Sequence, residues 1–252
     1  MRGLKIWQAI LLMAITLPAC ANSPSYSTEP DYYFSDPSQR ALAVAAGRGD
    51  TEAMQQALDQ GADPNMPGKD GMTPLFWSAT DTMGANIEGF RYLLAHGGDP
   101  NLVIIDEDKP GKSTIYLIYL AFTQTDPAFL EAALETGADP NTIVNTSRGN
   151  TLLFERQLDF YIDHVKLLLA YGADVNHRGQ FQAPPLNRAL YGSEYKAALA
   201  FVEAGADPTL ENEVNGATAL GIIKEFHDRE GGYDYNQLIK ALKNKGYLEE
   251  SF

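Results

Sequence analysis

Hydrophobic residues recur along this chain in short stripes with helical spacing, separated by stretches rich in Gly, Asp, Pro and Asn. Met54, Ala57 and Leu58 lie three or four positions apart, and Val165 precedes the aliphatic run 167–169. This spacing places the apolar side chains on one face of a helix, which can then pack against a neighbouring element. The pattern predicts an all-α fold of short amphipathic helices joined by turns.

The turns between the stripes repeat one motif. Gly-Ala-Asp-Pro-Asn occurs at residues 61–65 and 137–141, and close variants begin at Gly97, Gly172 and Gly205. Successive copies therefore begin 33 to 40 residues apart, and Gly246 begins a degenerate last copy. A period of this length is typical of arrays in which each supersecondary unit stacks on its neighbours.

These motifs resemble the ankyrin repeat over roughly residues 37–247, and residues 71–75 (Gly-Met-Thr-Pro-Leu) match the family's G-x-T-P-L. The resemblance implies an ankyrin-repeat solenoid of about six helix-turn-helix units with projecting hairpin loops, formed by residues 37–252. Each motif glycine is expected to end a helix in the left-handed conformation. Asp36 followed by Pro37 is expected to begin the first helix.

Two of the predicted hairpins are longer than the family's spacing. Residues 102–110 and 142–148 separate the motif asparagine from the next unit by more positions than residues 65–71 do. Insertions in a solenoid map to loops on one face, which is often the binding face. Long loops are also tolerated at small entropic cost, so function and tolerance remain open.

The N-terminus has the layout of a secretory signal peptide. Arg2 and Lys5 precede an apolar run over residues 6–19. The run is too short for a permanent membrane span, because a helix needs about 20 apolar residues to cross the hydrocarbon. We therefore expect residues 1–19 to be a cleaved signal peptide.

The end of this run resembles the lipobox of bacterial lipoproteins. Leu17 and Ala19 fit the pattern before Cys20, whereas Pro18 is less usual. The resemblance implies lipidation of Cys20, and residues 20–36 would then form a lipidated tether rich in Ser and Pro. A signal peptide without lipidation remains an alternative. The aromatic residues 32–34 either dock on the first unit or belong to a flexible tether.

Composition and charge narrow the possible partners. The chain has 19 Lys plus Arg against 33 Asp plus Glu, a formal net charge of -14. Loss of residues 1–19 would remove Arg2 and Lys5 and no acid, which gives -16. Nucleic acid and anionic lipid surfaces would be repelled, so no nucleic-acid partner is expected. Cys20 is the single cysteine, so no internal disulfide can form.

No motif for catalysis, cofactor binding or a metal emerges. The four histidines lack metal-ligand spacing. Residues 111–114 (Gly-Lys-Ser-Thr) resemble the end of a phosphate-binding loop, but Asp106 stands where that loop needs glycine. The acids 106–108 lack the glycine and glutamate of a calcium loop, although a weak calcium preference remains open. We therefore expect no enzyme, no cofactor and no metal site.

The family resemblance implies protein binding through hairpin tips and the concave groove of the first helices. Phe181 is the sharpest candidate, since aromatic residues are favoured at interface centres, although it could instead pack on its neighbour. The predicted partner-binding residues, all at hairpin tips, are Lys69, Asp70, Met72, Asp106, Glu107, Asp108, Lys109, Arg148, Gln180 and Phe181.

Three classes of function compete. The first is an immunity lipoprotein that neutralises a periplasm-acting toxin, such as a lipase delivered by type VI secretion. The second is an envelope scaffold or an oxidative-stress protection factor that associates with a periplasmic enzyme, and the third, disfavoured, is an enzyme. Ala21 after the cysteine favours the outer membrane facing the periplasm over retention at the inner membrane. The unbound protein is expected to be a monomer.

Overall fold

The computed structural model describes residues 29–80, 85–106, 113–249 and 251–252, without the side chains of Asp106, Ser113, Phe181 and Asp228. The predicted signal peptide, Cys20 and most of the predicted tether lie outside the described residues. Within the described part, no helix has the length and apolar character needed to cross a membrane.

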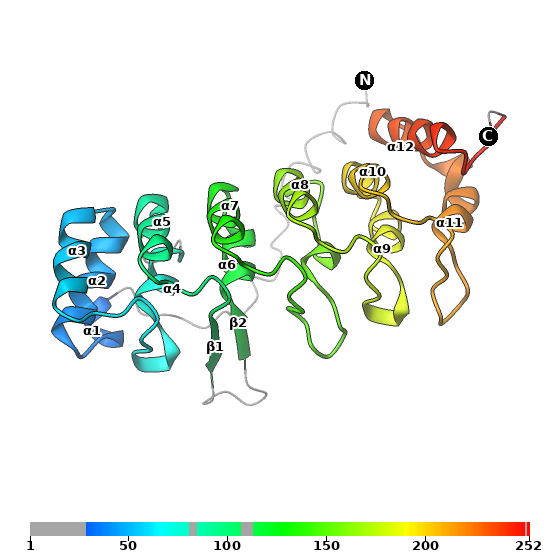
Figure 1. The fold of residues 1–252 in the computed structure, drawn as a ribbon. Coiled ribbons are helices and arrows are strands. Elements are labelled where there is room, and N and C mark those ends of the chain that lie inside the picture. The colour runs from blue at the N-terminus through cyan, green and yellow to red at the C-terminus, as the bar shows by residue number, and fades with distance from the viewer. Residues whose placement is uncertain (1–28, 81–84, 107–112, 250) are drawn as a thin grey trace, which may run out of the picture.

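Over the described residues the chain forms six stacked units in two helical layers (Figure 1). The second helices form one layer, which comprises α3 (Thr51–Asp59), α5 (Ile87–Ala95), α7 (Ala128–Glu135), α8 (Ile162–Ala170), α10 (Tyr195–Glu203) and α12 (Tyr233–Asn244). The first helices form the other layer, which comprises α2 (Pro37–Arg48), α4 (Pro74–Ser78), α6 (Leu117–Thr123), α9 (Pro185–Tyr191) and α11 (Ala219–Phe226), the last followed by the 3-10 turn η5 (His227–Arg229). In the fourth unit the short 3-10 turn η3 (Leu152–Phe154) stands in place of a first helix.

The hairpins between the units all project from the same side of the stack (Figure 1). The first and fourth carry the 3-10 turns η1 (Lys69–Gly71) and η4 (Gln180–Gln182). The second, which the sequence predicts to be long, contains the antiparallel strands β1 (Val103–Asp106) and β2 (Ser113–Tyr116), with Val103 opposite Tyr116. The hairpins therefore form a row beside the layer of first helices.

The repeated motifs begin and end helices as their chemistry predicts. The Thr73 hydroxyl accepts a hydrogen bond from the Phe76 amide at 3.1 Å, and Pro74 occupies the first turn of α4, where no amide hydrogen is needed. Gly61 and Gly137 have φ of +91° and +103°, a conformation that strains residues with a Cβ. The prediction that these glycines close helices in the left-handed conformation is confirmed.

Asparagines of the motif link each unit to the next. Asn141 donates through Nδ2 to the Gly172 carbonyl at 3.2 Å and accepts through Oδ1 from the Asp174 amide at 2.7 Å. Asn65, Asn101 and Asn176 make the same pair of bonds to the glycine and aspartate of the following copy. The ladder thus joins all five copies of the motif.

One hydrophobic core runs through the units without a break. Leucines at equivalent positions of successive first helices or turns, Leu75, Leu117, Leu152 and Leu186, are all fully buried. Because each unit buries its apolar face only against its neighbours, the array is stable only as a stack.

The N-terminal end of the stack is covered by the aromatic segment before the first unit. The helix α1 (Pro30–Tyr33) leads into Phe34, and Tyr33 and Phe34 are each 2% exposed. Their ring centroids lie 5.9 and 6.1 Å from that of Trp77. Of the two alternatives for this segment, docking is the one observed for Tyr33 and Phe34, whereas Tyr32 stays 44% exposed.

Candidate functional site

The fourth unit departs most from the repeat, and this departure positions the candidate site. Its first segment turns once as η3 and then leaves the helix, with Gln157 at a φ of +62°. Glu155 and Arg156 consequently lie beside the neighbouring α9 instead of continuing a helix of their own.

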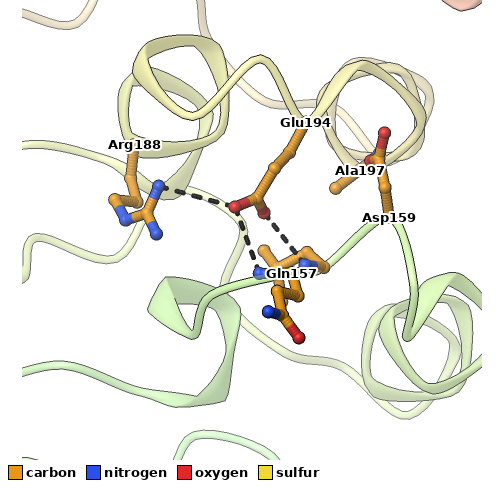
Figure 2. A network of polar contacts seen from close by, with 6 residues as sticks. Gln157, Asp159, Arg188, Glu194 and Ala197 are labelled. Atoms are coloured by element: carbon orange, nitrogen blue, oxygen red, sulfur yellow. Dashed lines mark hydrogen bonds and ion pairs between the residues drawn. The ribbon is translucent and has the colours of Figure 1, made fainter. Parts of the chain in front are cut away.

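Two carboxylates hold this irregular segment to the fifth unit (Figure 2). Glu194 accepts hydrogen bonds from the backbone amides of Gln157 at 3.2 Å and Leu158 at 3.0 Å. In the opposite direction, Asp159 accepts from the Ala197 amide at 2.8 Å, in the first turn of α10. The Glu194 carboxylate thus pairs two amides of the irregular segment, while Asp159 caps a first-turn amide of α10 that the helix itself leaves unpaired.

Beside this segment lies a pocket of about 530 Å³ on the side of the first helices and hairpins. The third hairpin supplies Asn145, Arg148 and Asn150 to its lining, and the segment after it supplies Phe154, Glu155 and Arg156. The other wall comes from the next two units, which supply Gln180, Ala183, Asn187, Arg188, Tyr191, Asn212, Val214 and Asn215. The pocket therefore spans the fourth to the sixth unit.

The charges in this pocket are mainly positive. Arg148, Arg156 and Arg188 line it, against the single carboxylate of Glu155. Burial raises the pKa of Glu155, and the nearby Arg188 guanidinium partly opposes that rise. Arg188 Nη1 also lies 3.6 Å from Glu194 Oε1 (Figure 2). A pocket lined by three guanidinium groups is suited to binding carboxylate groups, which arginine contacts with paired hydrogen bonds.

The pocket also offers aromatic surface. Tyr191, at the end of α9, is 51% exposed, whereas Phe154 is 7% exposed. Tyrosine and arginine are the residue types on which binding energy concentrates in protein interfaces. The lining therefore has the composition of a protein-binding surface.

Two of the predicted tip residues in the first hairpin are accessible and one is not. Lys69 and Asp70 are exposed in η1, and Lys69 Nζ lies 3.5 Å from the ring centroid of Tyr32. Met72 is only 5% exposed and belongs to the core. The prediction that Met72 lies at a solvent-facing tip is wrong, because the Gly68 amide bonds the Met72 carbonyl at 2.7 Å and closes the turn before that residue.

The remaining predicted tip residues fall into two groups. Glu107, Asp108 and Lys109 lie outside the described residues, as do the side chains of Asp106 and Phe181. Arg148 and Gln180, which come from successive hairpins, both line the pocket. The structure therefore brings together two predicted residues that the sequence places on separate loops.

Sequence reasoning missed Arg156, Arg188 and Tyr191. Arg188 and Tyr191 lie on α9, a first helix, and the family's concave groove is formed by first helices, so their position in the repeat could have indicated them. No comparable signal exists for Arg156, because its placement depends on the irregular course of the fourth unit.

The described residues contain no group of three His, Cys, Asp or Glu side chains that could hold a metal ion. The buried His164 lies among aromatic rings and contacts Phe122 and Tyr161 edge-on, which is a packing role.

Comparison with protein families identifies the repeats. A family model described as ankyrin repeats, in three copies, matches residues 24–104. A Fowlpox virus (strain NVSL) protein named as an ankyrin repeat protein, FPV024, is 27% identical over 170 residues, which are 68% of this chain and 26% of that protein. A protein from Rickettsia bellii (strain RML369-C), also named as an ankyrin repeat protein, is 27% identical over 149 residues. These residues are 58% of this chain and 55% of that protein. This chain thus spans about a quarter and about half of these relatives.

Solved structures share the fold. An ankyrin repeat domain (ABAYE2397) from Acinetobacter baumannii AYE superposes with a TM-score of 0.61 at 23% identity, over 81% of this chain and 97% of that one. A chain from the complex of the predatory endopeptidase Bd0816 of Bdellovibrio bacteriovorus with the immunity protein Bd3460 superposes with a TM-score of 0.57 at 24% identity, over the same shares. This chain is an ankyrin-repeat solenoid, as the motifs predicted, and ankyrin repeats are protein-interaction modules.

Proposed function

We propose that this chain is a lipid-anchored envelope protein that binds and neutralises a toxin acting in the periplasm, and that the pocket over units four to six is part of its binding surface. The observation that carries the proposal is the pocket itself, which presents Arg148, Arg156, Arg188 and Tyr191 on a protein-interaction scaffold. Such a lining can hold a partner's loop, and the solenoid bound there would cover the surface of the toxin around that loop.

The N-terminal sequence supports the place of action. The apolar run over residues 6–19 and Cys20 are the features of an exported lipoprotein. An anchor would confine the binder to the envelope and raise its effective concentration where a membrane-attacking or wall-attacking toxin acts. A lipase delivered by type VI secretion is one toxin of this kind.

One structural neighbour supports the class of partner. A chain of the same fold occurs in the complex of an endopeptidase with its immunity protein. The likeness concerns the fold alone, since the identity is 24%. It supports immunity as a role that an ankyrin solenoid can perform.

The test is survival of cells that export the product of the neighbouring gene to the periplasm, with and without this protein. We expect survival only when this protein is present. Equal survival would contradict the toxin proposal and leave the envelope scaffold or stress-protection factor.

A matched pair of variants ties protection to the pocket. Tyr191→Ala removes an exposed tyrosine from the pocket, whereas Tyr171→Ala removes one from the end of α8, in the opposite helical layer. We expect Tyr191→Ala to reduce protection and Tyr171→Ala to preserve it, with both variants melting as the parent does. Full protection by Tyr191→Ala would place the binding surface elsewhere on the solenoid.

A further inference from the structure

The pocket over units four to six is rich in hydrogen-bond donors. Three of its asparagines already use their side-chain oxygens, because Asn150 Oδ1 accepts from the Gln180 amide at 2.7 Å, Asn212 Oδ1 from Val214 at 2.8 Å and Asn215 Oδ1 from Ala217 at 3.0 Å. These bonds determine which way each amide group is turned. The Nδ2 groups donate to no described residue and remain as donors in the pocket lining.

The arginines add donors that also carry charge. Arg148 and Arg156 are exposed, and neither forms an ion pair with any residue that the structure describes. Glu155 is the one carboxylate among the described lining residues and Glu194, outside the lining, pairs with Arg188, so Arg148 and Arg156 supply the positive charge of the pocket in a chain whose formal charge is -14. The pocket is therefore positively charged in a protein that is negatively charged as a whole. A ligand rich in acceptors and negative charge complements it.

The lining also contains acceptors that can bond a donor of the ligand, the Glu155 carboxylate and the Tyr191 hydroxyl, whereas Asn187 is buried. Asn187 is 1% exposed, its Nδ2 donates to the Ala217 carbonyl at 3.0 Å, and its Oδ1 has no hydrogen-bond partner among the described residues. That oxygen is enclosed by the protein and out of a ligand's reach, so it is the Glu155 carboxylate and the Tyr191 hydroxyl that favour a ligand with an N–H group. A phosphodiester offers acceptors only, whereas a peptide offers carboxylates, carbonyls and backbone N–H groups together.

We propose that this pocket binds a short acidic segment of the partner protein, one whose Asp or Glu carboxylates contact Arg148 and Arg156 and whose backbone contacts the asparagines. The proposal rests on the proposed function, which makes the partner a toxin, and it adds the chemistry of the segment that the pocket holds. A volume of about 530 Å³ lies within the range of pockets that enclose small ligands, and it accommodates several side chains.

The chain's overall acidity does not oppose this segment at close range. At physiological ionic strength the screening length is about 8 Å, so distant acidic residues are screened while contacts inside the pocket are not. A partner that is basic overall would still be attracted at long range and would place one acidic loop in the pocket.

The experiment measures fluorescence anisotropy of short labelled peptides with the full-length chain in non-ionic detergent at physiological salt. Labelled oligoglutamate is the probe and labelled oligolysine its comparison, while binding of inorganic phosphate and of phosphatidylglycerol in mixed micelles is measured by calorimetry. We expect oligoglutamate alone to bind. The double variant Arg148→Glu/Arg156→Glu should weaken that binding by about tenfold or more, since charge-assisted hydrogen bonds are lost and the new carboxylates repel the probe.

Lys166→Glu is the matched control, because it makes a charge reversal on α8 of the same unit, in the opposite helical layer, and should change affinity less than about twofold. The milder Arg156→Gln should also weaken binding, which guards against a fold lost by charge reversal. Unchanged binding in the arginine variants would overturn the inference, and so would arginine-dependent binding of phosphate or phosphatidylglycerol without oligoglutamate binding. No toxin enters this assay, so its result is independent of the survival test. If oligoglutamate binds but cells are not protected, the proposed function is contradicted, while the preference of the pocket for acidic peptides stands.

Discussion

The asparagine at the end of each motif has a different task from the glycine at its start. The side-chain amide of Asn141 bonds the next unit through both of its polar atoms, since the nitrogen donates to Gly172 and the oxygen accepts from Asp174. Thr209 stands in place of asparagine in the last full copy, and its hydroxyl bonds only Asp207 within the same turn. The change occurs where the following copy, which begins at Gly246, lacks the motif aspartate.

Removing one such asparagine should uncouple two units. We expect Asn141→Ala to lower the free energy of unfolding by about 1 to 3 kcal/mol, because two hydrogen bonds of about 0.5 to 1.5 kcal/mol each are lost. Urea denaturation followed by circular dichroism measures the change. Thr209→Ala, which breaks no bond between units, is the matched control. Equal losses in the two variants would show that the ladder does not contribute to coupling.

His164 is expected to make stability depend on pH. Burial lowers the pKa of this ring below its ordinary value of 6.5, and the Gln124 backbone and the charges of Asp163 and Asp126 only partly oppose that effect. The unfolded chain then binds a proton at a higher pH than the folded chain does. Stability should therefore be greatest above 6.5 and fall as the pH drops below that value.

The measurement is the free energy of unfolding between neutral pH and about pH 5, for the parent chain and for His164→Phe. Phenylalanine preserves the ring contacts with Phe122 and Tyr161 but cannot be protonated. We expect the variant to lose part of the decline with acidification. Parallel curves for the two proteins would show that other groups cause the dependence.

At the scale of elements, α1 and Phe34 replace the hairpin that the first unit lacks. They cover the end of the core beside Trp77, and a Cβ added to Gly68 would come within 2.3 Å of the Tyr33 carbonyl oxygen. The segment therefore fits closely against the first hairpin.

This fit predicts a large effect of one ring. Phe34→Ala should destabilise the chain by about 3 to 5 kcal/mol, the usual cost of deleting a buried aromatic side chain. Tyr32→Ala, in the same segment but at a 44% exposed ring, should cost much less. Thermal unfolding compares the two, and similar melting temperatures would show that the docked segment is dispensable.

In the fourth unit, the course of the segment after η3 depends on contacts with the fifth unit. Glu194 accepts the Gln157 and Leu158 amides and Asp159 accepts the Ala197 amide, so side chains of both units hold the irregular segment in place without a first helix. The space beside that segment is the pocket that holds Arg148, Arg156 and Arg188.

For the molecule as a whole, the proposed anchor is its most testable part. Cys20→Ser removes the sulfur to which a lipid would be attached, so we expect labelled palmitate to be incorporated by the parent chain and not by the variant. The variant protein should be unprocessed or released to the periplasm. Label retained by the variant would contradict the lipoprotein proposal.

The sequence by itself determined the repeat, its period and its capping chemistry. Gly137, Thr73-Pro74 and Asp36 act within one turn of the chain, and local steric and hydrogen-bonding rules decide such positions. The motif alone therefore predicts the solenoid and its row of hairpins.

Only the tertiary structure decided which residues meet. Arg148, Arg156 and Arg188 lie in different segments, and the course of the fourth unit, held by Glu194 from the fifth, brings them to one pocket. Met72 illustrates the reverse case, because a predicted tip residue turned into the core once the hairpin closed. Local rules specify where helices begin and end, whereas a binding surface depends on contacts between residues that are distant in sequence and on how each unit adapts to its neighbours.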